Sequence, residues 1–432
     1  MNTPKVSVIM PSYNCALYIT EAIDSVLSQT FKNFELIIVD DGSTDNTIEL
    51  IENYNDKRII LIKNEMNRGV ATTRNIGYKA SKGEYIVISD SDDINLPMKF
   101  EEQVNYLDNH EDIDIVGCHY QHFSELKYLQ KWAFSDENEY IKSMRLFWNE
   151  QAPASMFRKK KIESLGLLYH DESYQAAVDS EWFSKMPKEI RFTNIQKVLY
   201  LYRRHTNQMT QEGVQNTQSK FVDKIRENMI VNTGIVPSQF EKIIHFTLCD
   251  YTSVERYPDL PFIEIRNWAE KLIIANEESK FNEINIFSKL VARRFFELCN
   301  HFSYQGNKVW NAWEEFKYKH LLDEEVKLIP DEVILKLLKN KSVAIFGTLR
   351  SAYILLYRLQ RLNLNISYLI DNNLESSITE IDGYSVYRID ELNRKPVDIV
   401  IMTVQSNNRY LLKSYIQTNH KKIKTLLIED FI

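Results

Sequence analysis

The sequence predicts an α/β protein with a mainly parallel sheet, followed by a helical region and a small second α/β unit. Short apolar runs alternate with segments of helical periodicity through the first 90 residues, and the same alternation returns after residue 340. Between these parts glycine is scarce and apolar residues recur with a period of about 3.6. Strands that alternate with helices form parallel sheets, which bind ligands at the carboxyl ends of their strands.

The first domain is expected to consist of β-α-β units. Its apolar runs carry β-branched residues, which favour strands, and the segments between them repeat apolar residues at helical spacing. The expected strands cover 5–10, 35–39, 59–62, 85–89 and 113–118, and the expected helices cover 19–27 and 69–80. One acidic group follows the second strand and another follows the fourth. We therefore expect both groups at the carboxyl edge of the sheet.

The rest of the chain predicts two more domains. Residues 218–335 have the pattern of amphipathic helices. Beyond them, strands are expected at 342–346, 366–370 and 398–403, with a helix at 352–362. The expected domains are 1–215, 216–338 and 339–432, of which the last is Rossmann-like.

Composition narrows the classes of function. Hydrophobic residues make up 44% of the 432 residues and charged residues 26%, which suits a folded chain with several cores. The formal net charge of -7 argues against a general nucleic-acid-binding protein. Four widely spaced cysteines predict neither a disulfide framework nor a paired-cysteine metal site. We expect no signal peptide and no membrane-spanning run, and therefore a cytoplasmic protein whose only membrane contact is peripheral, at the inner face.

The acidic cluster Asp90–Asp93 has the residues of a metal site. Carboxylates two positions apart at the end of a strand can converge on one cation, and their hard oxygens suit Mg²⁺ or Mn²⁺. Such an ion would stabilise the charge on a departing diphosphate. Taken alone, such a cluster is more often an acidic turn without a ligand.

Asp40 and Asp41 form the second acidic group. Gly42 permits a tight turn after them, and Ser43 or Asp45 can cap the next helix without any further role. Capping does not account for two adjacent carboxylates at the edge of the sheet. A carboxylate there could accept a hydrogen bond from a nucleotide base or a ribose hydroxyl.

Four motifs together resemble the family 2 inverting glycosyltransferases, which have the GT-A fold. They are Val6–Asn14, Asp40–Thr47, Asn67–Gly77 and Asp90–Asp93, in the family's order and spacing. A later segment, Tyr202–Thr210, is similar to the family's Tyr-Arg-Xaa-His segment. The resemblance implies a GT-A type nucleotide-sugar-binding domain. It also implies that a sugar is transferred, with inversion, from a nucleotide-sugar donor that we expect to be a UDP-sugar.

Roles for individual residues follow from the resemblance. Asp41 would contact the uracil, Arg74 the base or a phosphate, and Asp90 the ribose side. The residues implied in donor binding are Pro11, Tyr13, Asn14, Asp41, Arg68, Arg74, Asp90 and Ser91. Asp92 and His205 would hold the metal, Mn²⁺ or Mg²⁺. Without the family, the two arginines are equally surface charges, and a single histidine is more often structural.

The family's catalytic base lies in an acidic motif at the start of a helix, usually a Glu-Asp pair. The best match here is Ala177–Phe183, with Asp179 as the base and Val178 in place of the usual glutamate. Glu181 is the rival for this role, and Asp171 and Glu172 are weaker candidates. Helix capping is the alternative role for Asp179.

The C-terminal unit lacks the glycine pattern of a dinucleotide site. Gly347 is present, but Leu349 takes a position where close approach of the backbone to a pyrophosphate needs glycine. Tight NAD binding is therefore not expected. A structural role is favoured instead, or contact with a second copy of the chain or a partner enzyme.

The implied acceptor is a saccharide or a lipid-linked saccharide, in the biosynthesis of a bacterial surface polysaccharide such as a capsule or lipopolysaccharide. Two alternatives belong to other classes. One is a nicotinamide-dependent sugar oxidoreductase or epimerase that uses the C-terminal unit. The other is a catalytically silent glycan- or nucleotide-binding protein, suggested by Val178 in the base motif.

Overall fold

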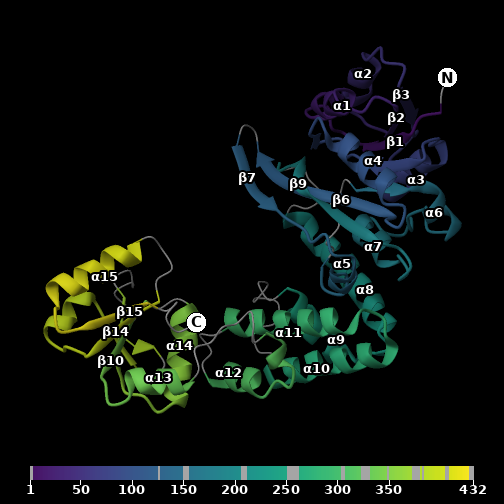
Figure 1. The fold of residues 1–432 in the computed structure, drawn as a ribbon. Coiled ribbons are helices and arrows are strands. Elements are labelled where there is room, and N and C mark those ends of the chain that lie inside the picture. Colours follow the sequence, from purple (N-terminus) through teal and green to yellow (C-terminus); the bar gives the residue numbers. More distant parts are fainter. Residues whose placement is uncertain are drawn as a thin grey trace. The chain divides into compact units, whose positions relative to one another are not determined.

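The computed structural model describes residues 3–124, 127–148, 155–205, 212–250, 262–302, 307–322, 331–347, 350–371, 380–381, 384–403 and 408–427. The chain forms two compact units, one of Met1–Ser238 with Ala275–Phe287 and the other of Gln239–Ile274 with Ser288–Ile432 (Figure 1). The three-domain division expected from the sequence stays a prediction. Each unit is described by itself below.

The first unit is built on one large sheet with helices on both sides. Its strands are β1 (Val6–Ser12), β2 (Phe34–Asp40), β3 (Ile59–Lys63), β4 (Tyr85–Ile88), β5 (Ile94–Asn95), β6 (Ile115–Ser124), β7 (Lys127–Trp132), β8 (Met156–Arg158) and β9 (Phe192–Arg203). Its helices are α1 (Ile19–Leu27), α2 (Thr47–Glu52), α3 (Val70–Ala80), α4 (Lys99–Asn109), α5 (Asn138–Met144), α6 (Lys159–Ser164), α7 (Val178–Ser184) and α8 (Glu212–Asn232).

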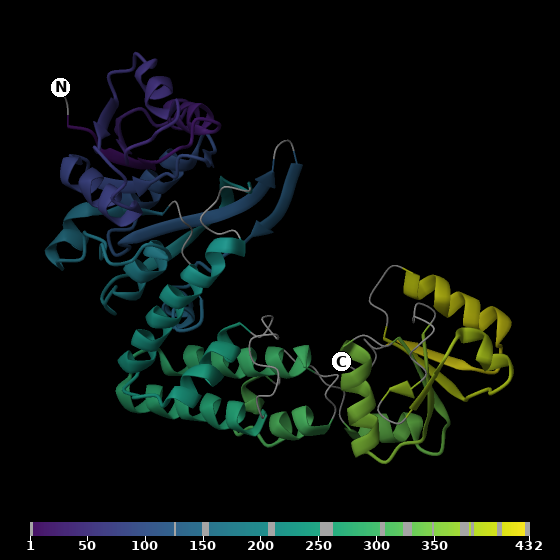
Figure 2. The ribbon, with the colours of Figure 1, turned by 180° about the vertical axis from the view of Figure 1, so that it is seen from behind.

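The strand order of this sheet is β3-β2-β1-β4-β8-β6-β9-β5, with β7 paired to β6. The first four strands are parallel to one another, as are β6 and β9, whereas β8 runs antiparallel to both of its neighbours. The expected α/β class with a mainly parallel sheet is therefore confirmed. Figure 2 shows β6, β7 and β9 side by side, and Figure 1 shows the same arrangement from the opposite direction.

Side chains of the central strand β1 alternate between two cores. Val6, Val8 and Met10 pack with α1 and α4 on one face of the sheet. Ile9, between them, packs on the other face with Tyr78 of α3 and with α7. Because both faces are covered by helices, the strands read as nearly continuous apolar runs, which made them recognisable in the sequence.

The carboxyl ends of the parallel strands meet at one edge of the sheet. Ser12 at the end of β1 is opposite Asp40 at the end of β2, and Ile9 is opposite Ile88 at the end of β4. The loops that follow these strands therefore emerge next to each other. They carry the two acidic groups that the sequence places at this edge.

The second unit combines helices with a smaller sheet. The helices are α9 (Gln239–Cys249), α10 (Phe262–Ser279), α11 (Ile284–His301), α12 (Asn307–Glu314), α13 (Asp331–Leu338), α14 (Arg350–Arg361) and α15 (Asn408–Asn419), with 3-10 turns at Lys319–Leu322 and Ile389–Asn393. The end of α10 and the start of α11 belong to the first unit. The strands are β10 (Val343–Phe346), β11 (Ile366–Ile370), β12 (Glu380–Ile381), β13 (Tyr384–Tyr387), β14 (Ile399–Met402) and β15 (Lys424–Leu427).

The order of the smaller sheet is β12-β13-β11-β10-β14-β15, and its pairings are parallel except for β12 with β13. Two apolar clusters cover its faces. The second, mainly parallel sheet agrees with the expected small α/β unit, and the sequence analysis did not predict its strands β12, β13 and β15. The Rossmann-like character of this unit stays a prediction. Leu349, on which the argument against NAD binding depends, lies outside the described residues.

None of the helices in the described part of the chain is both long enough and apolar enough to span a membrane.

Gly42 provides a test of the turn after β2. Its φ is +76°, and a Cβ at this position would lie 2.8 Å from backbone atoms of Met66. We expect Gly42→Ala to lower the free energy of unfolding by about 2 to 4 kcal/mol, from left-handed strain and a backbone clash together. Gly166→Ala is the matched control, because its φ is +70° and no atom lies within 4 Å of the added Cβ. Urea unfolding of both variants checks this, and equal losses would contradict the clash.

Candidate active site

The loop after β2 is held by its own carboxylates. Asp40 is buried and accepts hydrogen bonds from the backbone N–H of Ser43 at 2.8 Å and from its hydroxyl at 2.6 Å. Asp41 accepts hydrogen bonds from the Asn64 side chain at 2.7 Å, and from the backbone N–H groups of Arg68 at 3.0 Å and Gly69 at 2.8 Å. A uracil contact by Asp41 would have to share or replace these bonds, because a carboxylate has about four acceptor positions.

Asn14 joins the loop after β1 to the loop after β2. Its backbone N–H donates to the Ser43 hydroxyl at 2.9 Å, and its side-chain oxygen accepts from the Thr44 backbone N–H at 2.8 Å. Asn14 has a φ of 48°, which asparagine tolerates better than most residues. Neighbouring Tyr13 is exposed, whereas Pro11 lies within β1 and is buried opposite Val39.

Arg74 connects the acidic cluster to the candidate base. Its buried guanidinium donates to the Asp90 carboxylate at 3.2 Å and to the Asp179 carboxylate at 2.7 Å. Burial alone would lower the pKa of Arg74, but the two carboxylates outweigh it and raise this pKa. The Arg74 bridge, formed by Arg74, Asp90 and Asp179, therefore joins α3, the loop after β4 and α7. The expected contact of Arg74 with the nucleotide base or a phosphate stays a prediction.

Asp179 and Glu181 lie in the same turn of α7 but in different environments. The Asp179 side chain is 35% exposed and pairs with Arg74. Glu181 is buried and forms an ion pair with Lys185, and burial raises the pKa of Glu181. The helix begins after Ala177, which has a φ of 56°, and no side-chain hydrogen bond caps it. The capping alternative for Asp179 is therefore wrong.

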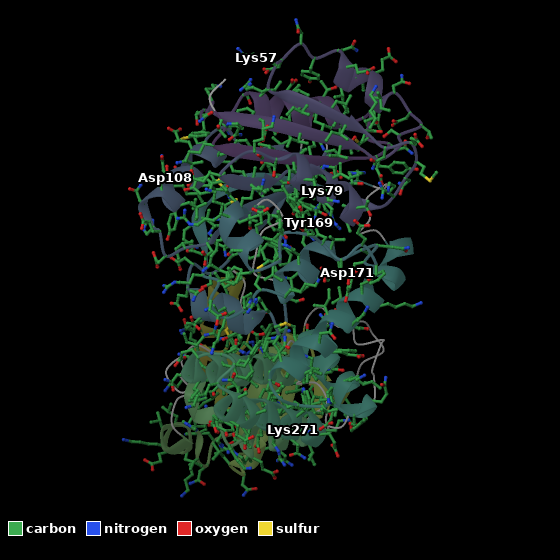
Figure 3. All side chains as sticks on the ribbon, turned by 90° about the vertical axis from the view of Figure 1, so that its right-hand side faces the viewer. Lys57, Lys79, Asp108, Tyr169, Asp171 and Lys271 are labelled. Carbon is green, nitrogen blue, oxygen red and sulfur yellow. The ribbon has the colours of Figure 1, made fainter. Side chains whose placement is uncertain are left out.

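Hydrogen bonds connect the segment before α7 to α3. The sequence analysis did not predict the residues that form them. The Asn75 side chain accepts from the His170 N–H at 2.8 Å and donates to the His170 carbonyl oxygen at 3.0 Å. Burial lowers the pKa of His170 well below its usual value, and its Nε2 lies 2.9 Å from the Tyr78 hydroxyl. Figure 3 shows Lys79 beside Tyr169, with the amine 5.8 Å from the ring centroid.

Asp92 and His205 face each other at the end of β9. The His205 Nε2 lies 3.0 Å from Oδ2 of Asp92, and the His205 ring packs 4.4 Å from the Tyr18 ring. The Asp92 carboxylate is an oxygen ligand of the kind that suits Mn²⁺ or Mg²⁺. One carboxylate with one imidazole leaves most of an octahedral shell for diphosphate oxygens and water, so these residues can hold the expected ion. No larger group of metal-binding side chains occurs in the part of the chain that the structure describes. Residues 206–210 of the motif that contains His205 lie outside it.

Arg203 and Asp93 hold the acidic loop after β4 in place. The Arg203 guanidinium donates to the Asp92 carbonyl oxygen at 2.7 Å and to Glu21 at 2.6 Å. Asp93 is buried and accepts from the Tyr200 hydroxyl at 2.7 Å and the Arg203 N–H at 2.8 Å. Burial and the neighbouring Asp179 raise the pKa of Asp90 to about 6 despite Arg74. The only sequence feature that could have pointed to Arg203 is its place in the Tyr-Arg-Xaa-His segment.

The structure thus gathers the predicted residues into two groups. Arg74, Asp90 and Asp179 are joined directly, and Asp92 with His205 lies on the same acidic loop as Asp90. The second group comprises Asn14, Asp41 and the backbone of Arg68. Arg68 is an exposed side chain, and Ser91 is partly exposed. The donor-binding, metal and base roles of these residues stay predictions.

Comparisons with known proteins show the family that the chain resembles. A family model described as glycosyl transferase family 2 matches residues 7–166. An uncharacterized glycosyltransferase of Haemophilus influenzae is 32% identical over 240 residues, which are 53% of this chain and 74% of the relative. The Escherichia coli protein WfaP, named UDP-Glc:alpha-D-GlcNAc-diphosphoundecaprenol beta-1,3-glucosyltransferase, is 30% identical over 232 residues, or 53% of this chain and 87% of WfaP.

Among solved structures, residues 1–349 of S. aureus TarS are similar, at 20% identity with a TM-score of 0.46, over 74% of this chain and 92% of that one. A likeness of this degree carries no argument about function.

The Arg74 bridge is tested by removing its cation. We expect Arg74→Met to lower the free energy of unfolding by about 2 to 4 kcal/mol, because it leaves two carboxylates without their partner. The loss falls short of that for a fully buried pair, since Asp90 is 26% and Asp179 is 35% exposed. Arg68→Met removes an exposed arginine and is the matched control, with an expected change within about 0.5 kcal/mol. Equal urea midpoints for the two variants would rule out a stabilising bridge.

Proposed function

The chain belongs to glycosyl transferase family 2, and we propose that it transfers a sugar from a UDP-sugar to a saccharide acceptor with inversion at the anomeric carbon. As a glycosyltransferase it is an enzyme of a different class from the nicotinamide-dependent alternative, and it differs from the non-catalytic alternative that Val178 suggests. The observation that carries the proposal is the Arg74 bridge, which joins a carboxylate of the acidic loop to a partly exposed carboxylate on α7.

In the proposed reaction, Asp179 is the general base. Its Oδ1 is held by Arg74, while Oδ2 accepts no hydrogen bond from the described residues. Oδ2 would take the proton of the acceptor hydroxyl as the acceptor oxygen bonds to the anomeric carbon. The bond from that carbon to the diphosphate oxygen breaks, and UDP leaves with the electron pair. Inversion follows because attack and departure occur on opposite sides of the anomeric carbon.

The donor is proposed to lie over the loops that follow β1, β2 and β4. Asn14 and Asp41 fix the shape of the first two loops, and Tyr13, Arg68 and Ser91 offer partly or fully exposed groups to the nucleotide. Asp92 and His205 would hold Mn²⁺ or Mg²⁺, which when bound supplies positive charge to the diphosphate. The name of WfaP includes UDP-Glc, which supports a UDP-sugar as the donor.

The acceptor and the setting are also proposals. The WfaP name specifies a GlcNAc unit on diphosphoundecaprenol, which supports a lipid-linked saccharide as the acceptor class and assembly of a bacterial surface polysaccharide as the setting. Peripheral contact with the inner face of the membrane would bring the enzyme to such an acceptor. Contact of residues 339–432 with a second copy or a partner enzyme belongs to the same proposal.

Substitution of Asp92 tests the metal site. We expect Asp92→Ala to weaken Mn²⁺-dependent binding of UDP by about 10-fold or more, because a ligand of the ion is lost. Calorimetric titration with UDP, with and without Mn²⁺, measures the change. Asp112→Ala, which removes an exposed carboxylate elsewhere on the unit, is the control and should bind as the parent does. Unchanged affinity for Asp92→Ala would remove Asp92 from the metal site.

Substitution of Asp179 tests the base. Asp179→Asn keeps an oxygen for Arg74, so the fold and the affinity for UDP should be retained. Sugar transfer should nevertheless fall by about 10² to 10⁴-fold, the range for loss of a positioned base. Glu181→Gln, two positions along the helix, should retain most of its transfer rate because Glu181 is buried. The reverse pattern, an active Asp179→Asn with an inactive Glu181→Gln, would assign the base to Glu181.

A further inference from the structure

Five aromatic side chains form a continuous row on the sheet beside the candidate active site. This aromatic row consists of Tyr120 and His122 on β6, Trp132 on β7, Tyr202 on β9, and Trp148, four residues after the end of α5. Figures 1 and 2 both show the three strands next to one another. The side chains come from distant parts of the sequence, and strand pairing brings them together: Tyr120 is in register with Trp132, and His122 is in register with Tyr202.

Each ring of the row contacts the next. The centroids of Tyr202 and His122 are 5.2 Å apart, and those of His122 and Trp132 are 6.0 Å apart. Trp132 stacks on Trp148 with an interplanar angle of 14° and a centroid distance of 6.4 Å. Tyr120 lies beside this path and stacks on His122 at 5.4 Å. These distances lie in the range over which aromatic pairs attract.

The row differs from the core aromatics of the same strands in its exposure. Phe123 of β6 and Tyr200 of β9 are buried, as is Phe134, two residues after the end of β7. Members of the row are partly exposed throughout, and Trp148 at its end is 50% exposed. Leaving contiguous aromatic surface in water costs free energy in proportion to its area, so such a surface on a folded protein marks a binding site.

The chemistry of the row favours a sugar ring as its occupant. Burial, followed by the charge of Arg204, lowers the pKa of His122, so this ring is neutral near pH 7. The row thus offers flat uncharged faces, with hydroxyl and ring N–H groups at their edges. A pyranose has the complementary form: one face lined by C–H groups and a rim of hydroxyls that need hydrogen-bond partners.

Each end of the row lies on a segment that also contains or contacts residues of the candidate active site. Tyr202 is three positions before His205, which faces Asp92. Trp148 follows α5, and Arg145 between them donates to the carbonyl oxygens of Phe183 in α7 and Met186 just beyond it, at 2.9 Å each. Helix α7 carries Asp179. The row is therefore connected at one end to the segment of His205 and at the other to α7, which carries the proposed base.

We propose that the aromatic row is an acceptor subsite that stacks on a pyranose ring of the saccharide acceptor. This inference rests on the proposed function, because it assigns a place to the acceptor of that reaction. It adds a binding surface to the donor, metal and base residues. It also makes the row, and Trp148 in particular, a determinant of which saccharides are accepted.

The test uses the full chain, a UDP-sugar that the parent enzyme transfers, and GlcNAc-diphosphate-octyl as the acceptor. We expect Trp148→Ala to raise the KM for this acceptor by about 3- to 10-fold, the effect of losing one stacking contact. The affinity for UDP, measured by calorimetry, should stay at the parental value. Trp148→Phe should restore most of the acceptor affinity, because it returns an aromatic face.

Tyr128→Ala is the matched control. Tyr128 lies on the same strand as Trp132 and is 65% exposed, but it pairs in register with Phe123 beyond an irregularity in the β6–β7 ladder. Within the described residues no ring contact joins it to the row. Its removal should leave the acceptor KM unchanged. A rise equal to that of Trp148→Ala would overturn the specific role of the row.

Octyl diphosphate, as a competitive inhibitor, separates the sugar from the lipid and the diphosphate. Its inhibition constant should be the same for parent and Trp148→Ala. If Trp148→Ala weakens octyl diphosphate as much as it weakens the acceptor, the row does not bind the sugar and the inference fails. Transfer by Trp148→Ala with a parental acceptor KM would also reject the subsite, and only the subsite. A parent chain that neither binds UDP nor transfers sugar would reject the proposed function itself.

Discussion

The buried guanidinium of Arg74 is the constraint on which the candidate site depends. A charge removed from water is tolerated only with partners, and Arg74 has two, Asp90 after β4 and Asp179 on α7. Asp179 is 105 residues away in the sequence. Helix α7 must therefore lie where its first turn reaches α3, and one side chain joins the acidic loop directly to the proposed base.

Around this bridge, the loops are shaped mainly by carboxylates that bind backbone N–H groups. Asp40, Asp41 and Asp93 each accept at least one such bond while buried. Hydrogen bonds of a charged acceptor to the backbone are stronger than neutral ones and have a fixed direction. The acidic residues at this edge thus divide by position: the buried ones hold loops, and the partly exposed Asp90, Asp92 and Asp179 remain accessible to ligands.

Local patterns predicted the parallel core well, since strands covered on both faces are short apolar runs with acidic ends, as in β2 with Asp40. They could not predict contacts between distant segments, such as the hydrogen bond of Asn75 with His170. The sequence around each of these residues carries no information about its distant partner. Strand β15 was missed because its four residues follow a basic stretch and show no alternation. The aromatic content of residues 110–210 was visible, but the row needed the pairing of β6 with β7 and β9.

The sequence alone does not decide whether Asp179 or Glu181 is the better candidate for the general base, but their positions on helix α7 separate them. Residues two apart on a helix point to different sides, so two carboxylates in one motif cannot share one environment. On α7 one side faces Arg74 and is accessible, and the other is buried with Lys185. A group that takes a proton from a bound hydroxyl must reach that hydroxyl. Accessibility, set by helix geometry rather than by acidity, therefore favours Asp179 as the base.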